Sequence, residues 1–124
     1  MRVLVCGGRN FGYVFKGGRK VMDYNIFNQA IDKVKEFSPS FIIQGGAKGG
    51  DEVGKETALV LDIPQQQFDA DWDTHGKAAG FIRNQRMLDE GKPDLVIAFP
   101  GGNGTADMVR RSRKAGIKVV EIGE

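Results

Sequence analysis

Short runs of consecutive apolar residues alternate along this chain with longer stretches in which apolar residues recur at helical spacing. Three runs, at residues 3–5, 41–43 and 95–99, are continuous rather than alternating, which is typical of strands buried on both faces. With two weaker runs, we expect strands at residues 2–6, 41–44, 65–68, 95–99 and 118–122. Helical periodicity, an Asp23 cap and later Gly and Pro stops predict helices at about 23–37, 51–61, 78–90 and 105–115.

This alternation of strands and helices predicts an α/β fold. We expect a Rossmann-like three-layer sandwich with a five-stranded, mainly parallel sheet in the order 3-2-1-4-5. A length of 124 residues fits one domain covering residues 1–124. The glycine-rich segment from Gly12 to Lys20 is expected to be a long loop that acts as a flexible lid.

A glycine-rich turn follows each of the three continuous apolar runs. Nine of the eighteen glycines lie in these turns, where a missing Cβ lets ligand oxygens reach several backbone N–H groups. In the expected strand order the turns open onto one crevice, which favours a single ligand rich in phosphate. The candidate ligand-binding residues are Gly7, Gly8, Arg9, Asn10, Gly45, Gly46, Ala47, Lys48, Gly49, Asp51, Pro100, Gly101, Gly102, Asn103, Gly104 and Thr105.

Several common chemistries are disfavoured by absent motifs. The G-x-x-x-x-G-K-[ST] spacing is absent, so ATP or GTP hydrolysis with magnesium is not expected. The first turn lacks G-x-G-x-x-G, which disfavours a nicotinamide dehydrogenase. The acidic segment at residues 69–75 holds the one histidine and is more typical of capping than of a metal site. We therefore expect no metal and no cofactor, and we expect Cys6 to be a buried small hydrophobe.

Charge and hydropathy limit the classes of partner that we expect for this chain. The net charge of +2 does not by itself call for nucleic acid, although basic residues crowd one helix at 110–114. The longest apolar stretch is about five residues, against the ~20 that a membrane span requires. Without a signal-type N-terminus, we expect a cytoplasmic protein with no membrane partner.

Five motifs in order resemble the YspA-like (cpYpsA-related) group of the SLOG superfamily, which is named for the DNA-processing protein Smf/DprA and the LOG enzymes. They lie at residues 3–9, 45–51, 70–72, 80–88 and 99–105. The resemblance implies a nucleotide-binding domain that dimerises. LOG-like members cleave the N-glycosidic bond of a nucleoside monophosphate with an arginine and with a glutamate three residues after the threonine of P-G-G-x-G-T. Met108 occupies that glutamate position here.

Three functions follow as hypotheses. The first is binding of a nucleotide-type small molecule, such as ADP-ribose or a nucleoside phosphate, by a sensor, carrier or sequestering protein. In it Arg83 and Asn84 either contact the ligand or brace the neighbouring loop, and Trp72 either stacks on a base or covers the core edge. The second is an N-glycosidic hydrolase with the candidate catalytic residues Arg83, Asp51, Glu52 and Asp107. The third is a DprA-like module for single-stranded DNA that uses Lys48 and residues 110–114.

Overall fold

The computed structural model, which describes residues 1–123, is an α/β domain built on a five-stranded parallel sheet. The strands are β1 (Arg2–Cys6), β4 (Phe41–Gln44), β5 (Gln65–Gln67), β6 (Leu95–Ala98) and β7 (Lys118–Glu121). All four strand pairings are parallel. The long helices are α1 (Tyr24–Lys35), α2 (Gly50–Leu61), α4 (Ala79–Asp89) and α5 (Asn103–Lys114). The arrangement is Rossmann-like, as expected.

The strand order along the sheet is β5-β4-β1-β6-β7. It differs in numbering from the expected 3-2-1-4-5 because the chain inserts two further strands after β1. These strands, β2 (Tyr13–Lys16) and β3 (Arg19–Met22), pair antiparallel as a separate hairpin. The expectation of a long loop from Gly12 to Lys20 is therefore wrong, because most of this segment forms the hairpin. Its tip, Gly17-Gly18, has φ angles of 57° and 76°, which suit the two-residue turns that join hairpin strands.

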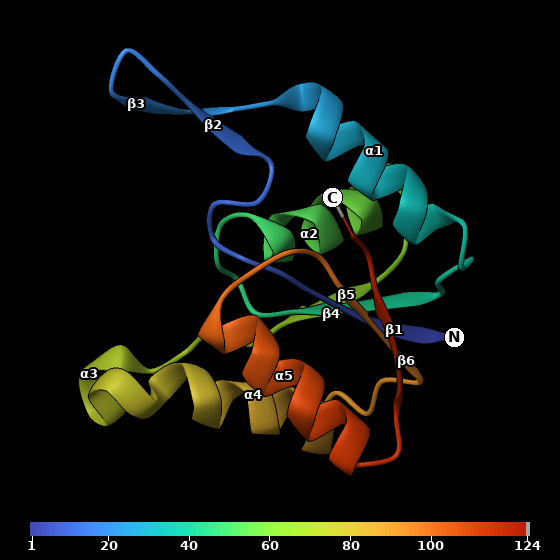
Figure 1. Cartoon of the computed structure of the whole chain (residues 1–124). Coiled ribbons are helices and arrows are strands. Elements are labelled where there is room, and N and C mark those ends of the chain that lie inside the picture. Colours follow the sequence, from blue (N-terminus) through green and yellow to red (C-terminus); the bar gives the residue numbers. More distant parts are fainter. Residues whose placement is uncertain (124) are drawn as a thin grey trace.

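Two hydrophobic cores lie on opposite faces of the sheet, as the layers in Figure 1 show. Val3 and Val5 of β1 face the core under α1 and α2, whereas Leu4 and Cys6 face the core under α4 and α5. Residues on both faces of β1 and β6 are buried, which explains why their apolar runs are continuous. Cys6 is buried, as expected, and burial raises the pKa of its thiol far above its usual range.

Local signals set the helix ends. The Asp23 carboxylate accepts hydrogen bonds from the backbone N–H groups of Asn25 and Ile26 and caps α1. The segment before α4, expected to be a loop, forms two short helices, α3 (Trp72–His75) and η1 (Gly76–Ala78), and Asp71 caps the first of them. These short helices carry Trp72 and Lys77 toward the carboxyl edge of the sheet. Within residues 1–123, no helix combines the length and apolarity needed to cross a bilayer.

Candidate functional site

The three glycine turns meet at the carboxyl edge of the neighbouring strands β4, β1 and β6. The Gly8 N–H donates to the Pro100 carbonyl at 2.9 Å, and the Gly50 N–H donates to the Gly8 carbonyl at 3.1 Å. Gly50 packs so closely on Gly7 that a Cβ at Gly50 would overlap the Gly7 backbone. The turns therefore form one continuous ridge of backbone, which we call the glycine ridge (residues 7–8, 49–50 and 100–101).

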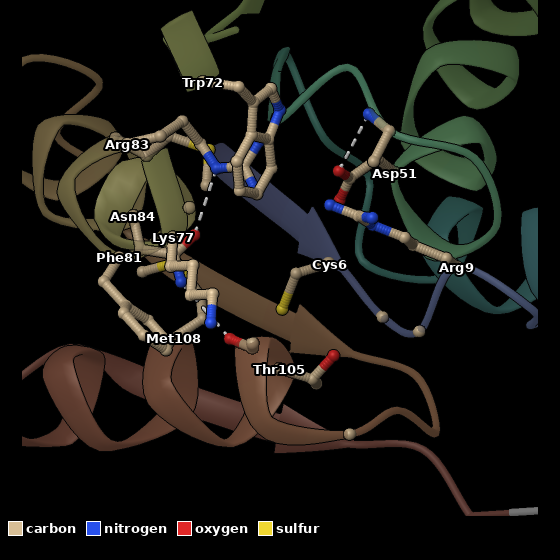
Figure 2. A pocket seen from close by; sticks show the side chains of 17 residues that line it. Cys6, Arg9, Asp51, Trp72, Lys77, Phe81, Arg83, Asn84, Thr105 and Met108 are labelled. Atoms are coloured by element: carbon tan, nitrogen blue, oxygen red, sulfur yellow. Dashed lines mark hydrogen bonds between the residues drawn. The ribbon is translucent and has the colours of Figure 1, made fainter. Parts of the chain in front are cut away.

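Beside the glycine ridge lies a cavity of about 380 Å³, shown in Figure 2, which we call the ridge cavity. Three cationic side chains and one carboxylate border it, so its charge favours an anionic ligand. Its lining residues are Cys6, Gly7, Gly8, Arg9, Ala47, Asp51, Trp72, Lys77, Gly80, Phe81, Arg83, Asn84, Met87, Gly102, Gly104, Thr105 and Met108.

The third turn presents unused backbone donors to the ridge cavity. Among residues 1–123, no acceptor bonds the N–H groups of Gly102, Asn103, Gly104 or Thr105, which open helix α5. A Cβ at Gly102 or Gly104 would meet no atom within 4 Å, so the approach to these donors is open. Free N–H groups and the helix dipole give this end of α5 a partial positive charge, as an anion site requires.

The second turn differs, because side chains of the same segment accept hydrogen bonds from three of its N–H groups. The Ala47 N–H donates to the Asp51 carboxylate at 3.1 Å, and the Gly49 N–H donates to the Glu52 carboxylate at 2.9 Å. The Gly46 N–H likewise donates to the side-chain oxygen of Gln44 at 2.6 Å. This turn therefore holds its shape with internal bonds, which make these three N–H groups unavailable to a phosphate.

The predicted ligand residues divide between locations. Those that border the ridge cavity are Gly7, Gly8, Arg9, Ala47, Asp51, Trp72, Arg83, Asn84, Gly102, Gly104 and Thr105. Those that border a second cavity of about 940 Å³, toward α1, include Asn10, Pro100 and Gly101. Those that border neither cavity are Gly45, Gly46, Lys48, Gly49 and Asn103. Sequence reasoning missed Lys77, because no motif marks it and only the short helix η1 brings it to the cavity.

Arg9 and Trp72 form the outer wall of the ridge cavity. The Arg9 guanidinium lies 5.3 Å from the centroid of the Trp72 ring, within the range of a cation–π contact. Figure 2 shows the end of the Arg9 side chain beside the Asp51 carboxylate. Trp72 is 48% exposed, so much of its ring surface is free to pack against a ligand.

Arg83 and Asn84 tie the second turn to the third. The Arg83 Nη1 donates to the Gly45 carbonyl at 2.6 Å, and its Nε donates to the Asn84 Oδ1 at 3.2 Å. The Asn84 Nδ2 in turn donates to the Gly104 carbonyl at 3.2 Å. Both residues also border the cavity, so they brace its walls and present polar groups to its interior.

Two of the candidate catalytic carboxylates lie away from the ridge cavity. Asp107 is 2% exposed and accepts hydrogen bonds from Arg110, Arg111 and Asn84. Glu52 accepts from the Tyr13 hydroxyl at 2.6 Å and from a backbone N–H of its own turn. Of the four candidates, Asp51 and Arg83 are the two that border the cavity.

Asp51 is a buried carboxyl group with an unusual affinity for its proton. Burial raises its pKa from the ordinary value of 3.8 to about 6. The positive charge of Arg83, the Ala47 N–H and the positive charge of Arg9 offset part of this rise. The group therefore changes its charge inside the cavity close to neutral pH.

We expect Asp51 to make the protein less stable as the pH rises. The unfolded chain loses this proton near pH 3.8 and the folded chain near pH 6, so stability from Asp51 falls across that window. Above pH 6 the ionised Asp51 lowers the free energy of unfolding by about 2–3 kcal/mol. The difference in unfolding free energy between Asp51→Asn and the wild type should therefore shift in favour of the variant by about 2–3 kcal/mol from pH 4 to pH 8. Urea unfolding of both proteins at the two pH values measures it. A constant difference between the two proteins would contradict this assignment.

Comparisons with known proteins identify the family of the chain. The family described as "YspA, cpYpsA-related SLOG family" matches residues 1–75, which include the first two glycine turns and Trp72. The chain belongs to this SLOG family. It is also 36% identical over 90 residues to the "Gene 61 protein" of Mycobacterium phage D29, covering 67% of this chain and 71% of the phage protein. No solved structure matches this SLOG chain.

Proposed function

We propose that this SLOG domain binds a nucleotide or nucleotide-derived ligand, of the nucleoside phosphate or ADP-ribose type, in the ridge cavity. One observation carries the proposal: the free N–H groups that begin α5 border the same cavity as Trp72 and Arg9. The free N–H groups can donate hydrogen bonds to a phosphate, and the Trp72 ring can stack on a flat base. A volume of about 380 Å³ falls within the range of small-molecule sites.

The proposed phosphate position is at the N-terminus of α5. There the N–H groups of Gly102 and Gly104 and the Thr105 hydroxyl are donors that need no rearrangement. Arg9 and Lys77 border the same cavity and add positive charge near that position. The base then lies toward Trp72, at the outer wall of the cavity.

The proposal is for binding rather than hydrolysis, so the domain acts as a sensor, carrier or sequestering protein. Met108, which stands where LOG-like enzymes have a catalytic glutamate, is buried and presents a thioether to the cavity. A thioether neither moves a proton nor stabilises a developing positive charge. The carboxylates of Glu52 and Asp107 are engaged elsewhere.

Replacing Trp72 with alanine tests the position of the base. Calorimetry should show Trp72→Ala weakening AMP binding by about tenfold, the lower range of a stacked base, while Trp72→Phe keeps most of the affinity. Ribose 5-phosphate, which has no base, should bind Trp72→Ala and the wild type equally. Equal weakening of both ligands would place the base elsewhere. No binding of AMP, ADP-ribose or NAD at millimolar concentration would contradict the proposed function itself.

A further inference from the structure

The hairpin of β2 and β3 projects from the body of the domain beyond α1, as Figure 1 shows. Its base is anchored, because Tyr13 packs edge-on against Phe27 and donates a hydrogen bond to Glu52. Its outer half is exposed from Phe15 to Val21. The base of the hairpin is thus fixed to the domain, and its tip contributes little to either core.

The exposed half of the hairpin combines an aromatic ring with positive charge. Phe15 is 68% exposed and pairs across the ladder with Lys20, so the two side chains share one face of the ribbon. Lys16 pairs with Arg19 beside the glycine tip, on the opposite face of the ribbon, because successive side chains of a strand point to opposite faces. No carboxylate occurs between residues 9 and 22. Within residues 1–123, none of these three cations lies within 4.0 Å of a carboxylate oxygen.

The positive charge extends from the hairpin toward the ridge cavity. The Lys20 Nζ donates to the Arg9 carbonyl at 3.0 Å and lies 4.6 Å from the centroid of the Tyr13 ring. The Lys48 Nζ lies 6.0 Å from the same ring. Lys20 and Lys48 therefore lie beside the Tyr13 ring and add positive charge at the base of the hairpin.

The basic cluster on α5, by contrast, is partly paired with carboxylates. Arg110 and Arg111 both pair with the buried Asp107, at 2.7 and 2.8 Å. Arg113 pairs with Glu121 at 2.9 Å. Three of the four cations at 110–114 thus have a carboxylate partner, although two of them share Asp107, whereas the hairpin cations have none within residues 1–123.

We infer that the exposed end of the hairpin, with Phe15 and Lys20 on one face and Lys16 and Arg19 on the other, binds single-stranded nucleic acid. Its cations would pair with successive phosphates, and Phe15 offers an exposed face on which an unpaired base stacks. The charge complementarity is to a polyanion, and the exposed ring favours one that carries flat bases. This inference does not depend on the proposed nucleotide site, because the hairpin does not border the ridge cavity.

Fluorescence anisotropy with a labelled oligothymidylate of about 20 nucleotides tests the inference, with oligouridylate in parallel. We expect Phe15→Ala to weaken binding by about tenfold and Phe15→Trp to keep it. We expect the double variant Lys16→Ala/Arg19→Ala to weaken binding at about 50 mM salt. The same double variant should make the negative slope of log affinity against log salt shallower by about 1.4, since each phosphate contact contributes about 0.7.

The matched control is Lys55→Ala/Lys118→Ala, which removes the same charge from exposed positions elsewhere and should leave the affinity unchanged. Every altered side chain is exposed, so thermal melts and AMP affinity should stay at wild-type values. Undetectable binding at low salt, or equal losses in the two double variants, would overturn the inference. Polyglutamate binding as tight as oligonucleotide binding, with no effect of Phe15→Ala, would also overturn it, because the surface would then recognise charge alone.

Discussion

Gly102→Asp is expected to abolish binding of phosphate ligands while the domain stays folded. Gly102 has φ −102°, an ordinary value for any residue, and a Cβ there meets no atom within 4 Å. An aspartate at this N-cap position would accept hydrogen bonds from the first N–H groups of α5 and take the donors that the ligand needs. Repulsion between the carboxylate and a phosphate about 4 Å away is worth about 4 kcal/mol near a protein surface, so we expect at least a hundredfold loss.

Two companion variants separate the causes of that loss. Gly102→Ala adds only a methyl group in open space and should bind AMP almost as the wild type does. Gly102→Asn caps the helix without charge, so it should fall between the alanine and aspartate variants. Calorimetry with AMP and thermal melts of all four proteins provide the measurements. If Gly102→Asp is folded and binds with unchanged affinity, the phosphate does not lie at the α5 N-terminus.

Gly50→Ala is expected to destabilise the whole domain by about 3 kcal/mol or more, a large part of the ~5–15 kcal/mol that a domain has. The added Cβ would overlap the Cα and the nitrogen of Gly7. These are backbone atoms at the end of the central strand β1, so no flexible side chain can move aside. The strain has to displace the start of α2 from the sheet.

The matched control is Gly104→Ala, which makes the same chemical change near the start of another helix. A Cβ at Gly104 meets no atom within 4 Å, and alanine is the better helix former, so stability should rise by ~0.5–1 kcal/mol. Urea unfolding of both variants provides the free energies. Equal stability of Gly50→Ala and the wild type would show that the glycine ridge tolerates separation of its turns.

The sequence by itself determined the layout of the fold. Continuous apolar runs located β1, β4 and β6 because strands buried on both faces have no polar face to alternate with. The turns after these strands were recognisable because glycine is required where backbones approach closely, as at Gly50. The hairpin is not among the elements expected from the sequence, although Gly17-Gly18 is a signal for a tight two-residue turn, because a segment rich in glycine also fits a flexible loop.

Only the tertiary structure decided which of these groups remain free to act. The second and third turns look alike in sequence, yet Asp51 and Glu52 occupy N–H groups of the second, whereas those that open α5 stay free. Likewise Asp107 pairs with Arg110 and Arg111 of α5, while the hairpin cations have no such partner within residues 1–123. Hydrogen bonding and charge pairing depend on distances of a few ångströms between folded segments, and residue order alone does not specify those distances.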